Sequence, residues 1–161
     1  MTSQEAQTFG ITKTLKATGL IVLLLLVVFM FEQTRGDFAN GILFFTQAIS
    51  NIHFLVILII LFGLTFLFGA KAGKEIIIQK KNIVFISVKY VILIILIIVI
   101  YAAIVGVIMD KTSSPDNFQR LVTTYFLTPL ARTGFLVIVP MLLIWLWATN
   151  QMKLADKKKK K

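Results

Sequence analysis

The sequence has no cysteine, one histidine and only seven acidic residues among 161. Without cysteine the chain forms no disulfide, offers no thiolate nucleophile and has no cysteine-ligated metal site. With His53 as the only histidine, a histidine-rich metal site is excluded as well. The residue spacings match no hydrolase or transferase motif. We therefore expect no catalytic residue, no bound cofactor and no metal, and a protein that is not an enzyme.

Acidic residues are also missing from the interiors of the apolar runs. Proton- and cation-coupled carriers generally need a carboxylate or an equivalent group inside the membrane. All seven acids of this chain lie in predicted loops, in tails or at the ends of apolar runs. This distribution argues against an ion-coupled transporter.

Apolar residues make up 58% of the chain, and its mean hydropathy is +0.90. Soluble domains contain about 45 to 50% apolar residues, so this composition is that of a membrane protein. The longest apolar run is residues 83–109, whose only charge is Lys89. A helix of this length extends about 40 Å, whereas a hydrocarbon core is about 30 Å thick. The run therefore predicts a transmembrane helix.

Four apolar runs predict an all-α integral membrane protein, a bundle of four transmembrane helices in a single domain over residues 1–152. The expected spans are residues 14–32, 52–70, 83–109 and 130–149. The first run could be a signal peptide, but Phe29 to Glu32 occupy the place of a small-residue cleavage site, so we favour an uncleaved span. Pro140 should kink the fourth span.

The connections between the runs also carry helical patterns. Apolar residues recur at helical spacing after Asp37 and again after Ser114-Pro115-Asp116, which has the composition of a helix start. These two segments predict short interfacial amphipathic helices on the non-cytoplasmic side. The second connection, residues 71–82, could form a small hairpin or a helical turn, and we favour the turn. Residues 153–161 should be a disordered basic tail.

Basic residues are distributed unevenly between the two faces that four spans define. Thirteen of the seventeen fall on the face that holds both termini and the second connection. By the positive-inside rule both termini are cytoplasmic, in what we expect to be a bacterial inner membrane. The residues predicted to contact anionic lipid there are Lys71, Lys74, Lys80 and Lys81. A net charge of +10 could also indicate nucleic acid, but the basic residues lie between and after apolar runs, so no nucleic-acid partner is expected.

Two sets of charged residues are candidates for a function. Lys89 could bind an ion or substrate inside the membrane, or extend to the headgroups; we favour the second, because no acid within the spans could partner it. The other set is an outer-edge polar cluster, which could bind phosphate or transfer protons, or could simply be polar helix ends, as we favour. Its members are Glu32, Arg35, His53, Asp110, Arg120 and Arg132.

Small residues inside the apolar runs suggest close helix packing. Ala102 and Gly106 lie four residues apart, and Gly63 lies inside the second run. Such positions allow helices to approach within the chain or toward another subunit. We therefore expect a small non-enzymatic membrane subunit or scaffold that packs with partner membrane proteins, or with itself, and with anionic lipid. The alternatives are a lipid-handling or small-solute transport protein that uses the outer-edge cluster, and a pore-forming protein of the holin kind.

Overall fold

The structure is a computed structural model that describes residues 1–34, 40, 42–43, 46, 50–109, 122–127 and 137–158. Within these residues all regular structure is helical, and no strand occurs. The described residues form four long α-helices and two π-helical turns of five residues each: α1 (Ser3–Thr34), α3 (Ile52–Gly73), η1 (Lys74–Ile78), α4 (Ile83–Met109), η3 (Thr123–Leu127) and α7 (Val139–Lys158). The prediction of an all-helical protein is confirmed for the described part of the chain.

Within the described part of the chain, three helical stretches are long and apolar enough to cross a membrane: Ser3–Val28, Ile52–Ile78 and Ile83–Met109. The helix α4 covers the same residues as the longest apolar run. The expected fourth span began at residue 130, but residues 130–136 lie outside the described residues. Its described remainder belongs to α7, so a fourth membrane crossing stays a prediction.

The first helix is longer than predicted, because α1 begins at Ser3 and not near residue 14. Its start is fixed by a reciprocal pair of hydrogen bonds. The backbone N–H of Glu5 donates to Thr2 Oγ1 at 3.2 Å, and the N–H of Thr2 donates to Glu5 Oε2 at 3.1 Å. This is a capping box, which satisfies two donors that a helix start leaves open. The spacing of Thr2 and Glu5 was a signal that the sequence prediction missed.

The connection from α3 to α4 is helical, as favoured over a hairpin. The helix α3 passes directly into the wider turn η1, and the chain then reverses through Gln79 to Asn82. Lys80 is in the left-handed region at φ 55°. The side chain of Asn82 then accepts a hydrogen bond from the N–H of Val84 at 2.8 Å, which caps the start of α4.

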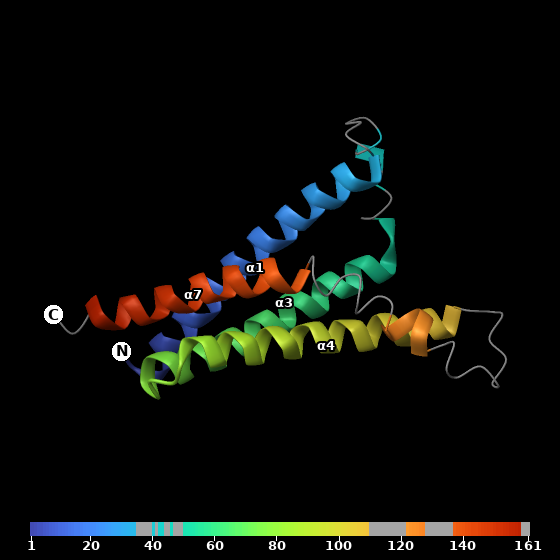
Figure 1. The fold of residues 1–161 in the computed structure, drawn as a ribbon. Coiled ribbons are helices and arrows are strands. Elements are labelled where there is room, and N and C mark those ends of the chain that lie inside the picture. The colour runs from blue at the N-terminus through green and yellow to red at the C-terminus, as the bar shows by residue number, and fades with distance from the viewer. Residues whose placement is uncertain are drawn as a thin grey trace.

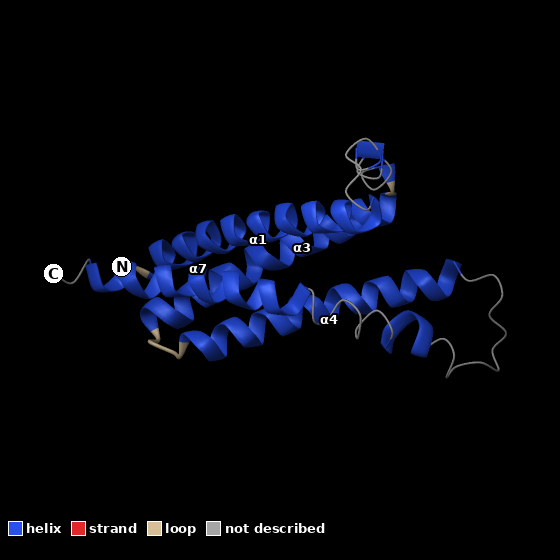
Figure 2. Ribbon diagram, turned by 45° about the horizontal axis from the view of Figure 1, so that its top comes forward, coloured by secondary structure: helices blue, strands red, loops and turns tan. Residues whose placement is uncertain are grey.

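The described helices lie closest together at one end of the bundle. This end holds the first residues of α1, the η1 turn and the last turns of α7, and the helices diverge toward the other end (Figures 1 and 2). The buried side chains are concentrated at the same end. In α1 none of residues 22–28 is buried, whereas in α3 the first buried residue is Thr65. The hydrophobic core therefore sits at the end of the bundle that carries the termini.

The helices α1 and α3 pack backbone against backbone. A Cβ added at Gly10 would overlap the carbonyl oxygen of Gly69, and one added at Gly73 would overlap the carbonyl oxygen of Ala6. Such close contact requires residues without side-chain bulk, as at many membrane helix crossings. Small residues recur every fourth position on both helices, and the sequence prediction overlooked these rows: Ala6, Gly10, Thr14, Thr18 on α1 and Thr65, Gly69, Gly73 on α3.

Hydroxyl pairs satisfy buried polar groups between helices. Thr18 Oγ1 lies 3.2 Å from Thr65 Oγ1, which joins α1 to α3, and Ser87 Oγ lies 2.8 Å from Thr149 Oγ1, which joins α4 to α7. All four residues are fully buried. Hydrogen bonds of this kind connect membrane helices without placing a charge in the apolar region.

Pro140 is the second residue of α7, after a π-helical turn at residues 137–138. Proline is tolerated in the first turn of a helix, where its missing N–H has no helical partner. The residues that would form the other arm of the predicted kink lie outside the described part, so the kink stays a prediction. Further along α7, Trp145 is fully buried whereas Trp147 is 52% exposed.

The two interfacial helices fall mostly outside the described residues. Of the segment after Asp37 the structure describes only isolated positions, and of the segment after Ser114 it describes residues 122–127. The latter include the turn η3, which contacts α4. A helical turn is therefore present there, and its place at a membrane surface stays a prediction.

Candidate functional site

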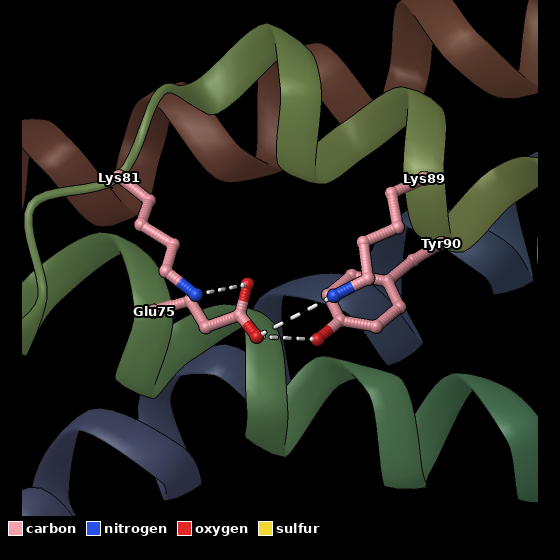
Figure 3. Close-up of polar contacts among 4 residues, drawn as sticks. All are labelled: Glu75, Lys81, Lys89 and Tyr90. Carbon is pink, nitrogen blue, oxygen red and sulfur yellow. Dashed lines mark hydrogen bonds and ion pairs between the residues drawn. The ribbon is translucent and has the colours of Figure 1, made fainter.

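A carboxylate with three polar neighbours lies near the turn between α3 and α4 (Figure 3). The hydroxyl of Tyr90 donates a hydrogen bond to Glu75 Oε1 at 3.0 Å. The ammonium of Lys89 lies 3.6 Å from the same oxygen, and the ammonium of Lys81 lies 3.6 Å from Oε2. We call these four residues the Glu75 cluster.

The local fold explains how the four residues meet. The turn η1 carries Glu75, the reversal that follows carries Lys81, and the second turn of α4 carries Lys89 and Tyr90. The Tyr90 ring is buried and stacks on Phe68 of α3, with the ring centroids 5.0 Å apart. The Lys89 ammonium lies 4.8 Å from the centre of the Tyr90 ring. Aromatic stacking therefore fixes the tyrosine, and the tyrosine in turn positions the carboxylate and the lysine.

The electrostatics of the Glu75 cluster favour a paired carboxylate. The Glu75 side chain is only 15% exposed, whereas those of Lys89 and Lys81 are 39% and 46% exposed. Oε2 of Glu75 is buried and accepts no hydrogen bond from any described residue, so the attraction of Lys81 at 3.6 Å is what compensates it. The carboxylate is thus held by two cations whose other N–H groups face solvent or headgroups.

The prediction excluded an acidic partner for Lys89 only within the expected spans, and the structure provides one from outside them. Glu75 lies in the connection that follows the second expected span. The helix continues past the expected end of the second span, through Gly73 and η1, and this extension brings Glu75 to the level of Lys89. The available signal was that both residues flank the same short turn. A role for Lys89 in ion or substrate binding stays a prediction.

The outer-edge polar cluster is described only in part. His53 lies in the first turn of α3, which Asn51 caps by accepting the N–H of His53 at 2.9 Å. The His53 Nδ1 atom is 3.5 Å from the hydroxyl of Tyr101 on α4. Glu32 lies in α1, but its side chain is outside the description. The cluster members outside the described residues are Arg35, Asp110, Arg120 and Arg132.

The small residues singled out from the sequence lie away from the tight contacts of this chain. Gly63 and Ala102 are exposed, and Gly106 is half-buried. A Cβ added at Gly63 would meet no described atom within 4 Å. Within the described residues the close helix approach is made elsewhere, at Gly10, Gly69 and Gly73. Contact of Gly63 and Ala102 with another protein stays a prediction.

The four lysines predicted to touch anionic lipid have different surroundings. Lys71 and Lys74 are exposed on the last turn of α3 and the start of η1. Lys80 forms an ion pair with Asp156 near the end of α7, and Lys81 belongs to the Glu75 cluster. All four lie near the end of the bundle that carries the termini. Their contact with lipid stays a prediction.

An apolar cavity of about 260 Å³ lies between the four long helices. Each helix contributes to its wall, for example Leu25 of α1, Leu61 of α3, Ile95 of α4 and Met141 of α7. Among the described residues of the wall only Thr18 is polar, and its hydroxyl already bonds Thr65. The cavity therefore suits an apolar occupant. Among the described residues, no three His, Asp or Glu side chains come together as a metal site would need.

No protein-family model, curated protein or solved structure matches this chain.

Proposed function

We propose that this chain is a non-enzymatic integral membrane subunit or scaffold that packs against a partner membrane protein, or a second copy of itself, and holds anionic lipid at its basic end. The observation that supports the proposal most strongly is an open glycine, Gly63, on an exposed apolar face of α3. In this proposal the chain crosses the membrane four times, with both termini on the cytoplasmic side.

The face around Gly63 has the composition of a helix-docking surface. Ile59, Phe62, Phe66 and Leu67 of α3 are 71%, 36%, 50% and 56% exposed, and Gly63 lies among them with no side chain. Glycine inside a helix costs about 1 kcal/mol relative to alanine. Lipid tails offset none of this cost, whereas a second helix gains close backbone contact at a glycine. A partner helix is therefore the occupant that accounts for the glycine.

A second exposed face on α4 supports the same proposal. Ile97, Ile100 and Ile104 are exposed and share one face of α4. The helices diverge toward this end (Figure 1), so this face is not covered by the described part of the chain. Exposed apolar faces on two helices are what a subunit within a larger membrane assembly would present.

The test is assembly in native membranes. The chain should copurify with a membrane protein, or crosslink to a second copy, in mild detergent. A Gly63→Leu variant should lose this assembly and still fold, because a side chain at position 63 meets no described atom. Leu23→Trp is the matched control, since Leu23 is 64% exposed on α1 and the change also adds bulk to an apolar surface. A wild-type chain that is monomeric, with no crosslinked partner in native membranes, would contradict the proposal.

The apolar cavity supports a second candidate, a lipid-handling protein. A pocket lined almost entirely by apolar side chains suits an acyl chain better than water. If the cavity holds such a chain, a photoreactive fatty acid will crosslink to residues such as Leu61 or Ile95. Leu61→Trp, which fills the space, should abolish the crosslink. Equal labelling of the variant and the wild-type protein would rule this candidate out.

A further inference from the structure

A second pocket, of about 660 Å³, lies at the end of the bundle that carries the termini. Its charged wall consists of Lys80, Lys81, Lys153 and Asp156, so three lysines face one aspartate. These residues come from the turn before α4 and from the end of α7, which lie far apart in the sequence. The fold therefore gathers positive charge in one concave place.

The lysines of this pocket keep donors available. Lys80 pairs with Asp156, yet its side chain is 50% exposed. Lys81 lies 3.6 Å from Glu75, longer than a hydrogen bond, and is 46% exposed. Lys153 is exposed and has no ion-pair partner within the part of the chain that the structure describes. An ammonium group has three N–H donors, so the pocket can offer several to one anion.

Apolar surface borders the pocket where α4 begins. Ile76 and Ile83 belong to the pocket wall, and Val84 at its edge is 57% exposed. Next to it Phe85 is 64% exposed, at the beginning of the most apolar helix of the chain. A free phosphate ion gains nothing from such surface, whereas the acyl chains of a phospholipid would cover it. Charge and hydrophobic surface together therefore favour a lipid.

We propose that this pocket binds the phosphate of an anionic phospholipid, with Lys81 and Lys153 as direct contacts and Lys80 shared between the phosphate and Asp156. Basic pockets between helices on the cytoplasmic side are a known form of lipid headgroup site. The site deepens the lipid contact of the proposed function, but it requires no protein partner. Its failure and the failure of the assembly proposal are therefore separate results.

The test is lipid binding to the purified full-length chain in detergent, followed by native mass spectrometry. One molecule of phosphatidylglycerol should bind per chain, with higher affinity than phosphatidylcholine. Lys153→Gln should weaken phosphatidylglycerol binding about fivefold, as expected for one basic contact. The matched control is Lys16→Gln, which removes the same charge from an exposed position on α1, outside the pocket, and should leave the affinity unchanged.

A variant that is expected to strengthen binding separates an effect on binding from an effect on folding. Asp156→Asn removes the anion that competes for Lys80 and should tighten phosphatidylglycerol binding. Circular dichroism and elution volume monitor the fold of each variant. Equal weakening by Lys153→Gln and Lys16→Gln, or weaker binding by Asp156→Asn, would overturn the site. So would equal affinity for phosphatidylcholine, or complete displacement of the lipid by millimolar inorganic phosphate, which would identify a free-phosphate site.

Discussion

The carboxylate of Glu75 lies 3.6 Å from the ammonium of Lys89, across the turn that joins α3 to α4. The contact connects two helices that could each cross a membrane. It places a lysine of the longest apolar run beside an acid that lies outside the run. The pairing removes the need for Lys89 to remain an isolated charge in the apolar region.

The first prediction concerns this pair. Glu75→Gln should lower the free energy of unfolding by about 1 kcal/mol, because it removes the charge but keeps an acceptor for the Tyr90 hydroxyl. The lysines are more than one third exposed, so solvent screening limits the loss. Unfolding in mixed detergent measures the change. Lys89→Gln should cost a similar amount, and the double variant should cost less than the two losses added. Strict additivity would mean that the pair is not coupled.

The second prediction concerns the crossing of α1 and α3. Gly73→Ala should destabilise the protein by about 2 kcal/mol, because the new methyl group overlaps the carbonyl oxygen of Ala6 and backbone atoms cannot turn aside. The same change at Gly63 should be neutral or stabilising by up to about 1 kcal/mol, because no described atom lies within 4 Å of a Cβ added there. Thermal unfolding of both variants in one detergent gives the comparison. Equal effects at the two positions would contradict the described crossing.

The third prediction concerns the backbone at Lys80. Its φ of 55° suits glycine and strains other residues. Lys80→Ala and Lys80→Gly both remove the ion pair with Asp156, so their difference isolates the backbone conformation. The glycine variant should be more stable than the alanine variant by about 1 kcal/mol. Denaturation midpoints measure the difference, and a more stable alanine variant would exclude a left-handed residue at this position.

The sequence predicted the helices better than it predicted their contacts. The length and apolarity of residues 83–109 indicated α4, because an apolar run of that length has few other stable forms in a membrane. The early start of α1 was missed, because residues 3–16 are polar enough to read as a tail, although Thr2 and Glu5 carried a capping signal.

The packing could not be derived from composition alone. Gly63 and Gly10 are both glycines in apolar or mixed surroundings, yet only Gly10 lies at a close crossing in the described residues. Their roles depend on which face of each helix meets a neighbour. The Glu75 cluster was missed for a related reason, since η1 carries the acid inward beyond the end of the apolar run.

Accessibility of single cysteines tests the central claim most directly, because the chain has no native cysteine. The account predicts that cysteines at Thr2, Gln79 and Gln151 react with a membrane-impermeant maleimide from the cytoplasmic side only, and that a cysteine at Asn51 reacts from the opposite side only. Labelling of Thr2 and Gln151 from different sides of the membrane would contradict an even number of crossings, and with it the proposed topology.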